Sequence, residues 1–464
     1  MGVLWYYSFA MKPTVRICSF EIVNIKNVRN GKIDMPNRLP GYAAEKGELL
    51  GIYGQNGSGK TSVVNAFSLL QRLICGQSLE SDTSSLITCG ENHATLAILF
   101  SIEGESGTHM VQYSVTLGAD TNGARVTKES ITIRANVPRA RTNTIAEFNE
   151  PELPTAAEFV PNVSFVKVLS NSSRQDLVIN KVLSYQERTS YIFNQRMYPL
   201  LLKLEKEAAG ALLAIRQYAE NNLFIIGHSK SGLVNVNLQP IPISHTSDDA
   251  ARSAVVGTCL INLNSPSTLP IPIYQEFKQS LAHMNQVMCK IIPGFHLQVR
   301  ELGLELSALN EELMRIELIA TRQGIEIPLK FESDGIKKII SMLLYWIIVS
   351  NTPGTCLIVD ELDASIFEYL LGELLMIWEE NAQGQLIFTA HNLHPLEMLD
   401  KRSVVFTTVD PTHRFIRLKN IKASNNLRDV YLRSLFIGGQ EFELYEETNK
   451  TEIARAIRKT IPRD

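Results

Sequence analysis

Residues 54–61 read Gly-Gln-Asn-Gly-Ser-Gly-Lys-Thr and match the whole GxxxxGK[ST] phosphate-binding pattern. An apolar run, residues 49–53, precedes them, and a helix-like stretch, residues 62–74, follows. In this strand–loop–helix setting the glycines allow backbone N–H groups to point at phosphate oxygens, and the helix N-terminus adds partial positive charge. The pattern therefore predicts nucleotide binding. The alternative is a glycine-rich turn without a ligand.

Within this loop we expect Lys60 to reach the terminal phosphates and the Thr61 hydroxyl to bind Mg²⁺. The residues predicted to bind the nucleotide in this part of the chain are Asn56, Gly57, Ser58, Gly59, Lys60, Thr61 and Ser62.

Two carboxylates follow an apolar run late in the chain. Residues 356–359 read Cys-Leu-Ile-Val, and Asp360 and Glu361 come next. In a P-loop sheet, Asp360 would lie beside Thr61 and hold Mg²⁺, directly or through water. Glu361 would be the general base that positions the attacking water. An apolar run ending in Asp-Glu also fits a strand followed by a solvated turn, but after a P-loop the metal site is the favoured interpretation.

Two further patterns point to phosphate. The apolar run 386–390 ends in His391, which can contact a γ-phosphate and sense its loss. His394 is a less well placed competitor, and a strand-end histidine without a ligand is the alternative. Ser333 and Gly335 stand at the start of a predicted helix, where a second phosphate can bind. A plain serine N-cap is the alternative there.

Strand signals dominate residues 14–184, and we expect an antiparallel meander with Gly-containing turns. The expected strands are 15–22, 49–53, 95–102, 110–117, 126–133 and 160–169, with a loop over 138–154. From residue 296 onward, short apolar strands and helices alternate, which predicts a parallel sheet covered by helices. The strands expected there are 297–306, 314–321, 356–359, 386–390 and 404–408, and the helices are 335–349, 366–379 and 450–459.

The middle of the chain, residues 185–295, has two helical seams of equal length. Apolar residues repeat at alternating spacings of three and four, first at Leu201, Leu204, Ala208, Ala211, Ile215 and Tyr218, then at Tyr274, Phe277, Leu281, Met284, Met288 and Ile291. The pattern predicts a helical hairpin or arm, and two ordinary amphipathic helices on a core are the alternative. Between the seams we expect strands over 223–226 and 233–243 and an exposed stretch over 244–253.

The composition excludes several classes. The formal net charge of −3 gives no overall basic field. The six cysteines have no paired spacing, which favours reduced thiols and disfavours a zinc module. Residues 1–10 lack a basic region, so we expect no signal peptide, and Met11 is an alternative start. The longest apolar run, 339–349, is too short to span a bilayer. We therefore expect a cytoplasmic protein without membrane contact.

Taken in order, the motifs resemble those of an ABC-class ATPase, and most closely the stand-alone prokaryotic ATPases of the SMC/RecF-like, OLD-related branch. The stretches that carry the resemblance are 25–29, 332–335, 360–365 and 389–392. The resemblance implies an α/β P-loop NTPase head with a mixed sheet, an antiparallel meander and flanking helices. The long separation between Lys60 and Ser333 fits an arm inserted between the halves of the head. The predicted domains are 1–184 and 296–464 for the two halves and 185–295 for the inserted arm.

Such heads bind ATP and Mg²⁺ and dimerise head-to-tail around two ATP molecules. The resemblance implies that Ser333 and Gly335 of one subunit touch the γ-phosphate bound to Lys60 of the other. It assigns catalysis to Lys60, Glu361 and His391 and the metal to Thr61 and Asp360. Two features depart from the family: Asp334 stands where the signature has glycine, and no glutamine has the context of the one that links the γ-phosphate to the arm.

The stretch after His391 leaves little room for a Toprim nuclease, and no His-Asn-His nuclease pattern is present. The chain resembles the ATPase subunits of antiphage systems such as Septu and PARIS. This implies a regulatory subunit that controls a separate nuclease and answers a trigger such as a phage protein. One alternative is a DNA-repair ATPase that binds duplex DNA, with Arg134, Arg139 and Arg141 as a thin basic cluster. Another is an assembly scaffold with little turnover. A transporter ATPase fits least.

Overall fold

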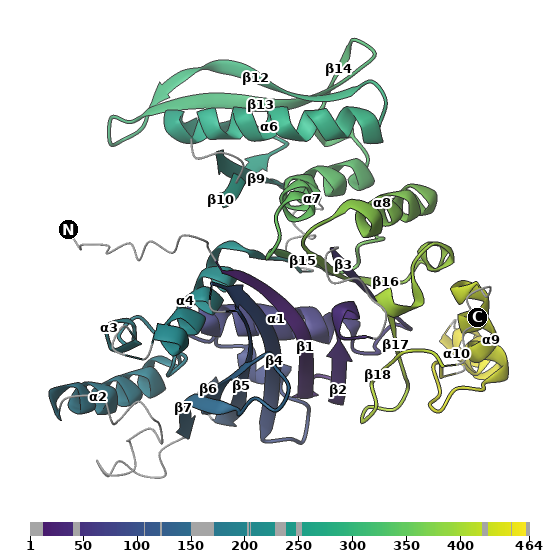
Figure 1. Ribbon diagram of the computed structural model, residues 1–464. Coiled ribbons are helices and arrows are strands. Elements are labelled where there is room, and N and C mark those ends of the chain that lie inside the picture. Colours follow the sequence, from purple (N-terminus) through teal and green to yellow (C-terminus); the bar gives the residue numbers. More distant parts are fainter. Residues whose placement is uncertain are drawn as a thin grey trace.

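The computed structural model describes residues 13–39, 47–105, 107–120, 123–149, 171–201, 204, 206–227, 238–246, 253–419, 426–446 and 448–460. The expected strand over 160–169 lies outside the described residues. Figure 1 shows a lower α/β body and an upper lobe made of a helix and a small sheet.

In the described part of the chain the central sheet has six strands in the order β18-β17-β3-β16-β15-β8. All neighbours run parallel except β17 and β18, which are antiparallel. The bounds are Glu48–Tyr53 for β3, Leu223–Ile226 for β8, Cys356–Val359 for β15, Gln385–Ala390 for β16, Val404–Thr407 for β17 and Phe415–Ile416 for β18. Strands buried on both faces are continuously apolar, which explains the short apolar runs in the sequence.

A second sheet, order β2-β1-β4-β5-β6-β7, is antiparallel throughout. Its strands are β1 (Thr14–Ile25), β2 (Val28–Asp34), β4 (His93–Gly104), β5 (Gly107–Asp120), β6 (Gly123–Ala135) and β7 (Asn143–Asn149). The predicted meander is confirmed. The loop predicted over 138–154 is wrong in part, because β7 forms there as an edge strand paired with β6, where polar residues are tolerated.

Helix α1 (Lys60–Ile74) lies between the two sheets. Its apolar face packs in one core with the antiparallel sheet and with Leu50 and Ile52 of β3. Leu49 and Tyr53 point to the opposite face of β3, where α7 (Asp334–Asn351) and α8 (Glu368–Asn381) cover the central sheet. The alternation along β3 therefore divides the molecule into two cores on either side of the P-loop strand.

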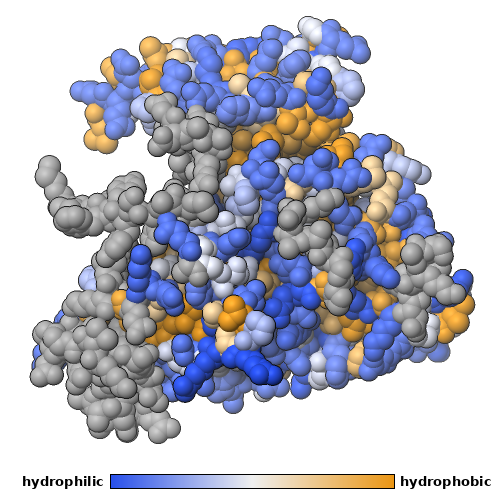
Figure 2. All heavy atoms as spheres, viewed as in Figure 1, coloured by the Kyte–Doolittle hydropathy of each residue, from blue (hydrophilic) through white to orange (hydrophobic). Residues whose placement is uncertain are grey.

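The upper lobe in Figure 1 contains α6 (Ile271–Ile291) beneath a small antiparallel sheet. That sheet has the order β11-β13-β12, with β14 paired to β13. The bounds are Ser267–Pro270 for β11, Phe295–Leu306 for β12, Glu312–Arg322 for β13 and Ile325–Pro328 for β14. A two-stranded ribbon, β9 (Leu238–Thr246) with β10 (Ser253–Asn262), lies between lobe and body. Figure 2 shows apolar groups at one end of the lobe. Leu304 and Leu306 near the end of β12 and Leu309 in the turn before β13 are exposed.

In the described part of 185–295, the two predicted helices do not pair as a hairpin. Helix α4 (Lys206–Asn221) carries the first seam from Ala208 to Tyr218 and packs in the core with α1, whereas Leu201 ends α3 and Leu204 lies between the two helices. The second seam, on α6, packs in the other core. Strand β8 lies between them and joins the central sheet. Each seam is thus an ordinary amphipathic helix on a core, which was the alternative interpretation. The division of the chain at residues 184 and 296 stays a prediction.

The other α-helices are α2 (Asn171–Glu187), α3 (Tyr198–Leu201), α9 (Leu427–Ile437) and α10 (Lys450–Thr460). The expected strand over 233–243 begins only at Leu238 among the described residues, and residues 247–252 of the expected exposed stretch lie outside them. Within the described part of the chain, no helix is long and apolar enough to cross a membrane.

Candidate active site

The phosphate-binding loop connects β3 to α1, as the sequence predicts. Gly54, Gly57 and Gly59 all have positive φ, so the loop turns its backbone in conformations that favour glycine. A side chain at Gly54 would collide with Thr407 of β17. The Lys60 ammonium donates hydrogen bonds to the carbonyl oxygens of Gly54 and Gln55, at 2.7 and 2.8 Å, and so lies across the loop.

Asp360 follows β15 and lies beside the start of α1. The Thr61 hydroxyl is 3.4 Å from Asp360 Oδ1, and the Thr389 hydroxyl donates to the same oxygen at 2.6 Å. Asp360 is 2% exposed, and its second oxygen, Oδ2, is buried without a hydrogen-bond partner among the described residues. Burying a carboxylate oxygen without a partner is costly, so this atom is available to a cation.

Glu361 and His391 come from the ends of neighbouring parallel strands, β15 and β16. The Glu361 amide donates to Thr389 Oγ1 at 2.8 Å. The amides of His391 and Asn392 both donate to Asp363 Oδ2, at 2.8 and 2.6 Å. Asp363 therefore orders the turn after β16 and the position of His391, which the sequence analysis did not foresee.

These elements enclose a cavity of about 240 Å³. It is lined by Lys26, Asn27, Asn56, Gly57, Ser58, Gly59, Lys60, Thr61, Ser62, Glu361, Thr389 and His391. The structure thus brings together every predicted P-loop residue, the predicted base and the predicted histidine. No glutamine is among the described residues that line the cavity. The glutamine that links the γ-phosphate to the arm in the related family therefore stays unassigned in this chain.

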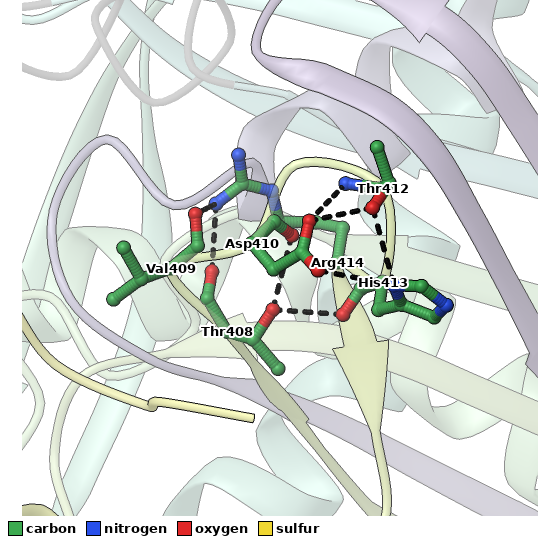
Figure 3. A network of polar contacts seen from close by, with 6 residues as sticks. All are labelled: Thr408, Val409, Asp410, Thr412, His413 and Arg414. Carbon is green, nitrogen blue, oxygen red and sulfur yellow. Dashed lines mark hydrogen bonds and ion pairs between the residues drawn. The ribbon is translucent and has the colours of Figure 1, made fainter. Parts of the chain in front are cut away.

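The cavity wall also includes a hairpin turn that sequence reasoning missed as a site element. Asn27, between β1 and β2, donates through its side chain to the Gly57 carbonyl and accepts from Ser62 Oγ at 3.2 Å. Arg414 donates to the Asn27 carbonyl at 2.7 Å and to the Thr408 carbonyl at 2.7 Å. Figure 3 shows Arg414 within the polar network of the loop after β17. The C-terminal loop thereby holds the hairpin against the P-loop.

Ser333 and Gly335 lie away from this cavity and do not line it. Ser333 is exposed and caps α7, accepting from the Ile336 amide at 3.4 Å. A Cβ at Gly335 would lie 2.1 Å from the Ser365 carbonyl oxygen, so only glycine fits. Arg134, Arg139 and Arg141, the thin basic cluster, are exposed at and after the end of β6.

Burial dominates the electrostatics of two titratable groups that line the cavity, Lys60 and His391. It lowers the pKa of Lys60 to about 8, although Asp363, Asp360 and Glu361 act in the opposite direction. Burial, and then the charge of Lys60, also lower the pKa of His391. A bound polyanion would offset both effects, because an opposite charge nearby favours the protonated forms.

The residues present fit Mg²⁺ and a nucleotide polyphosphate. Thr61, which lines the cavity, and Asp360 beside it offer hard oxygen donors, as Mg²⁺ prefers. The helix N-terminus, the loop amides and Lys60 offer positive charge at the phosphate side.

Solved structures of SMC head domains are similar to this chain. The SMC head bound to the C-winged helix domain of ScpA is 14% identical over 87% of this chain and 97% of its own length, with a TM-score of 0.40. The head with an extended coiled coil, bound to the C-terminal domain of ScpA from Pyrococcus furiosus, is 13% identical over 87% and 96%, with a TM-score of 0.41. The head from Thermotoga maritima is 12% identical over 87% and 100%, with a TM-score of 0.38. No protein-family model and no curated protein matches.

The class is defined by the described topology. A P-loop joins the central parallel strand β3 to α1, and an antiparallel sheet covers α1. The strand β16, which ends in His391, lies between β3 and the strand β15, which Asp360 and Glu361 follow. The chain therefore has the P-loop NTPase fold in the arrangement of ABC-type ATPase heads. The expected fold class is confirmed, except for the helical arm.

Proposed function

We propose that this chain binds and hydrolyses ATP with Mg²⁺ and does so as a head-to-tail dimer. The observation that carries the proposal is Oδ2 of Asp360, which is buried without a hydrogen-bond partner among the described residues, while Oδ1 of the same carboxylate lies 3.4 Å from the Thr61 hydroxyl. A carboxylate with an unused buried oxygen next to a hydroxyl is suited to a magnesium site, and the adjoining cavity is suited to a triphosphate.

Each site residue has a separate task in this proposal. Lys60 and the amides of the loop bind the β- and γ-phosphates, and Thr61 and Asp360 hold Mg²⁺, which would neutralise charge that develops on the phosphates. Glu361 lines the cavity and accepts a proton from the attacking water. His391, at the end of the neighbouring strand, faces the γ-phosphate. All of them come from strand ends or from α1, so their geometry is set by the sheet.

The placement of Ser333 and Gly335 supports the dimer. Both stand at the N-terminal turn of α7, where Ser333 is exposed and Gly335 is buried, and neither lines the cavity of its own subunit. In a head-to-tail dimer the same turn would present its amides and the Ser333 hydroxyl to the γ-phosphate of the other subunit. ATP binding would then promote assembly, and hydrolysis would release it.

We assign the dimer a regulatory role in antiphage defence, in which it controls a separate nuclease and responds to a phage-encoded trigger. The support is the resemblance of the motifs to the ATPase subunits of Septu and PARIS. A strain that carries the chain with a neighbouring nuclease gene should resist phage, and resistance should disappear with Lys60→Ala. Equal plating efficiency of phage on the wild type and the variant would remove the defence role and leave the ATPase proposal intact.

The ATPase proposal is tested with the full chain by steady-state ATP turnover and by mass measurement with and without ATP. We expect Lys60→Ala to bind no nucleotide. We expect Glu361→Gln to bind ATP, to lose turnover and to accumulate the dimer. Equal turnover in wild type and Glu361→Gln would reject Glu361 as the base and favour a scaffold with a structural nucleotide. ATP-dependent DNA binding that weakens with salt would instead favour the DNA-repair alternative.

A further inference from the structure

The first turns of α7 contact the loop that follows Asp360 at two points. Lys338, on the second turn of α7, donates a hydrogen bond from its ammonium to the backbone carbonyl of Glu361. One turn earlier, Gly335 lies directly against the carbonyl of Ser365. The helix that begins at Ser333 is therefore in contact with both ends of the segment 361–365, which starts with the proposed general base.

That segment has an unusual backbone. Glu361 has φ of 49° and Ser365 has φ of 65°, both in the left-handed region that side chains other than glycine and asparagine rarely adopt. Such conformations persist only where the surrounding structure holds them, and they concentrate at functional sites. The two residues of this segment that have positive φ are the same two that α7 contacts.

The Glu361 peptide is held from both sides. Its N–H donates to the Thr389 hydroxyl, and its C=O accepts from Lys338. The first bond connects Glu361 to β16 and, through Thr389, to Asp360. The second connects it to α7. With both flanking peptide groups held, the backbone fixes the direction of the Cα–Cβ bond of Glu361, a residue that lines the cavity.

The surroundings of Lys338 act on its charge in two opposite directions. Burial lowers the pKa of Lys338 to about 8, although the charges of Asp363, Glu361 and Asp360 act to raise it. Lys338 is thus a partly buried amino group aimed at the backbone of the proposed base, and it does not line the cavity itself. Its neighbour Lys337 points elsewhere, with its amino group 3.5 Å from Asp334.

We propose that Lys338 is a positioning residue that holds Glu361 in its left-handed conformation and so sets the general base from helix α7. The proposal rests on the proposed ATPase function. The Lys338 contact also connects two groups that would act on different nucleotides. Ser333, at the start of the same helix, would bind the nucleotide of the other subunit, whereas Glu361 would act on the nucleotide of its own subunit.

The test compares wild type, Lys338→Met and Lys338→Gln in ATP turnover, ATP affinity and thermal unfolding. Methionine keeps the length of the side chain and removes the donor, whereas glutamine keeps a shorter donor without the charge. We expect Lys338→Met to lower kcat by roughly tenfold or more, because a misplaced base loses part of its contribution to the rate. KM and the ATP affinity should stay unchanged within about twofold. Lys338→Gln should fall between the two.

The matched control is Lys330→Met, which removes a lysine whose amino group lies 4.9 Å from the ring centre of Phe331, before α7. It should retain wild-type kcat. Wild-type kcat in Lys338→Met would overturn the proposal, and so would a loss of ATP affinity in parallel with kcat, because that is the result of a structural defect. If Lys338→Met does not fold, Lys338→Gln decides: an unchanged kcat overturns the proposal. Absence of turnover in the wild type itself would reject the ATPase function instead.

Discussion

Glu129 and Asp360 are both buried carboxylates, and they differ in how their oxygens are used. Glu129, on β6, is 0% exposed and accepts from the hydroxyls of Tyr113 and Ser190, each at 2.6 Å. It also accepts from the amides of Tyr191 and Ile192, at 2.7 and 3.2 Å. Asp360 is as deeply buried, but one of its oxygens has no partner among the described residues.

The difference separates a structural carboxylate from a functional one. Glu129 is satisfied by four donors, and three of them, on Ser190, Tyr191 and Ile192, attach the segment after α2 to the antiparallel sheet. Asp360 has an oxygen without a partner in the described part of the chain, beside Thr61 of the cavity wall, at a cost that folding alone does not explain. Burial and charge are thus poor guides to function, whereas an unused acceptor next to a phosphate-binding loop is a good one.

The largest effect that sharpens this comparison is expected for Asp360→Asn. The variant keeps the acceptor for Thr389 but loses the charge that would bind Mg²⁺, so ATP turnover should fall by roughly a thousandfold. The melting temperature should stay equal or rise, because an unpaired buried charge is removed. ATP turnover and the melting temperature, measured on the same preparation, check these two expectations. A lower melting temperature would place Asp360 with Glu129 as a structural group.

The opposite pattern is expected for Glu129→Ala. Removing the carboxylate leaves four donors without their acceptor in a fully buried place, so the free energy of unfolding should decrease by about 3–5 kcal/mol. The ATP affinity of the protein that remains folded should change little, because none of these residues lines the cavity. Urea unfolding and nucleotide titration measure the two quantities. A selective loss of ATP affinity at unchanged stability would contradict the assignment.

A smaller effect is expected for Thr389→Val, because Thr389 donates a hydrogen bond to Oδ1, the oxygen of Asp360 that has partners. The substitution removes the donor to Asp360 and the acceptor for the Glu361 amide, and nearly preserves volume. We expect turnover to fall by roughly tenfold and stability by about 1–2 kcal/mol. Thr407→Val, whose hydroxyl donates to Ser58, is the matched control on the neighbouring part of the sheet. Equal losses of turnover in both variants would indicate a general packing defect.

The sequence predicts the parts of the site that are local in the chain. The P-loop, the acidic strand and the histidine strand are each a short run whose apolar residues and turn chemistry specify their own structure, and parallel pairing then brings their ends together. The meander is predicted for the same reason. Of the predicted site residues, Asp360, Ser333 and Gly335 do not line the cavity. Asp360 is buried beside Thr61, whereas Ser333 and Gly335 begin α7, on the opposite face of the central sheet from α1.

The parts that could not be predicted depend on contacts between distant residues. Nothing near Asn27 or Arg414 in the chain indicates that they meet at the P-loop, and Lys338 looks like any lysine of an amphipathic helix. The prediction that the two seams form a helical arm was wrong for a related reason. Heptad-like spacing states that a helix has an apolar face but not which surface covers that face, and here α4 and α6 cover different cores.

The smallest effect concerns the pH dependence of stability. Desolvation by burial raises the pKa of Glu129 above its ordinary value, against the lowering effect of its four hydrogen bonds. A carboxyl whose pKa is raised by folding adds stability that is fully present below its unfolded pKa and is lost as pH rises through the folded pKa. Glu129→Gln removes this titration. The stability of the wild type relative to this variant should therefore decrease from about pH 5 to about pH 8 in urea unfolding. If the relative stability of the wild type instead increased over this range, the four donors would outweigh burial and hold Glu129 as a carboxylate. Glu129 would then resemble Asp360 in its charge but still differ from it in function.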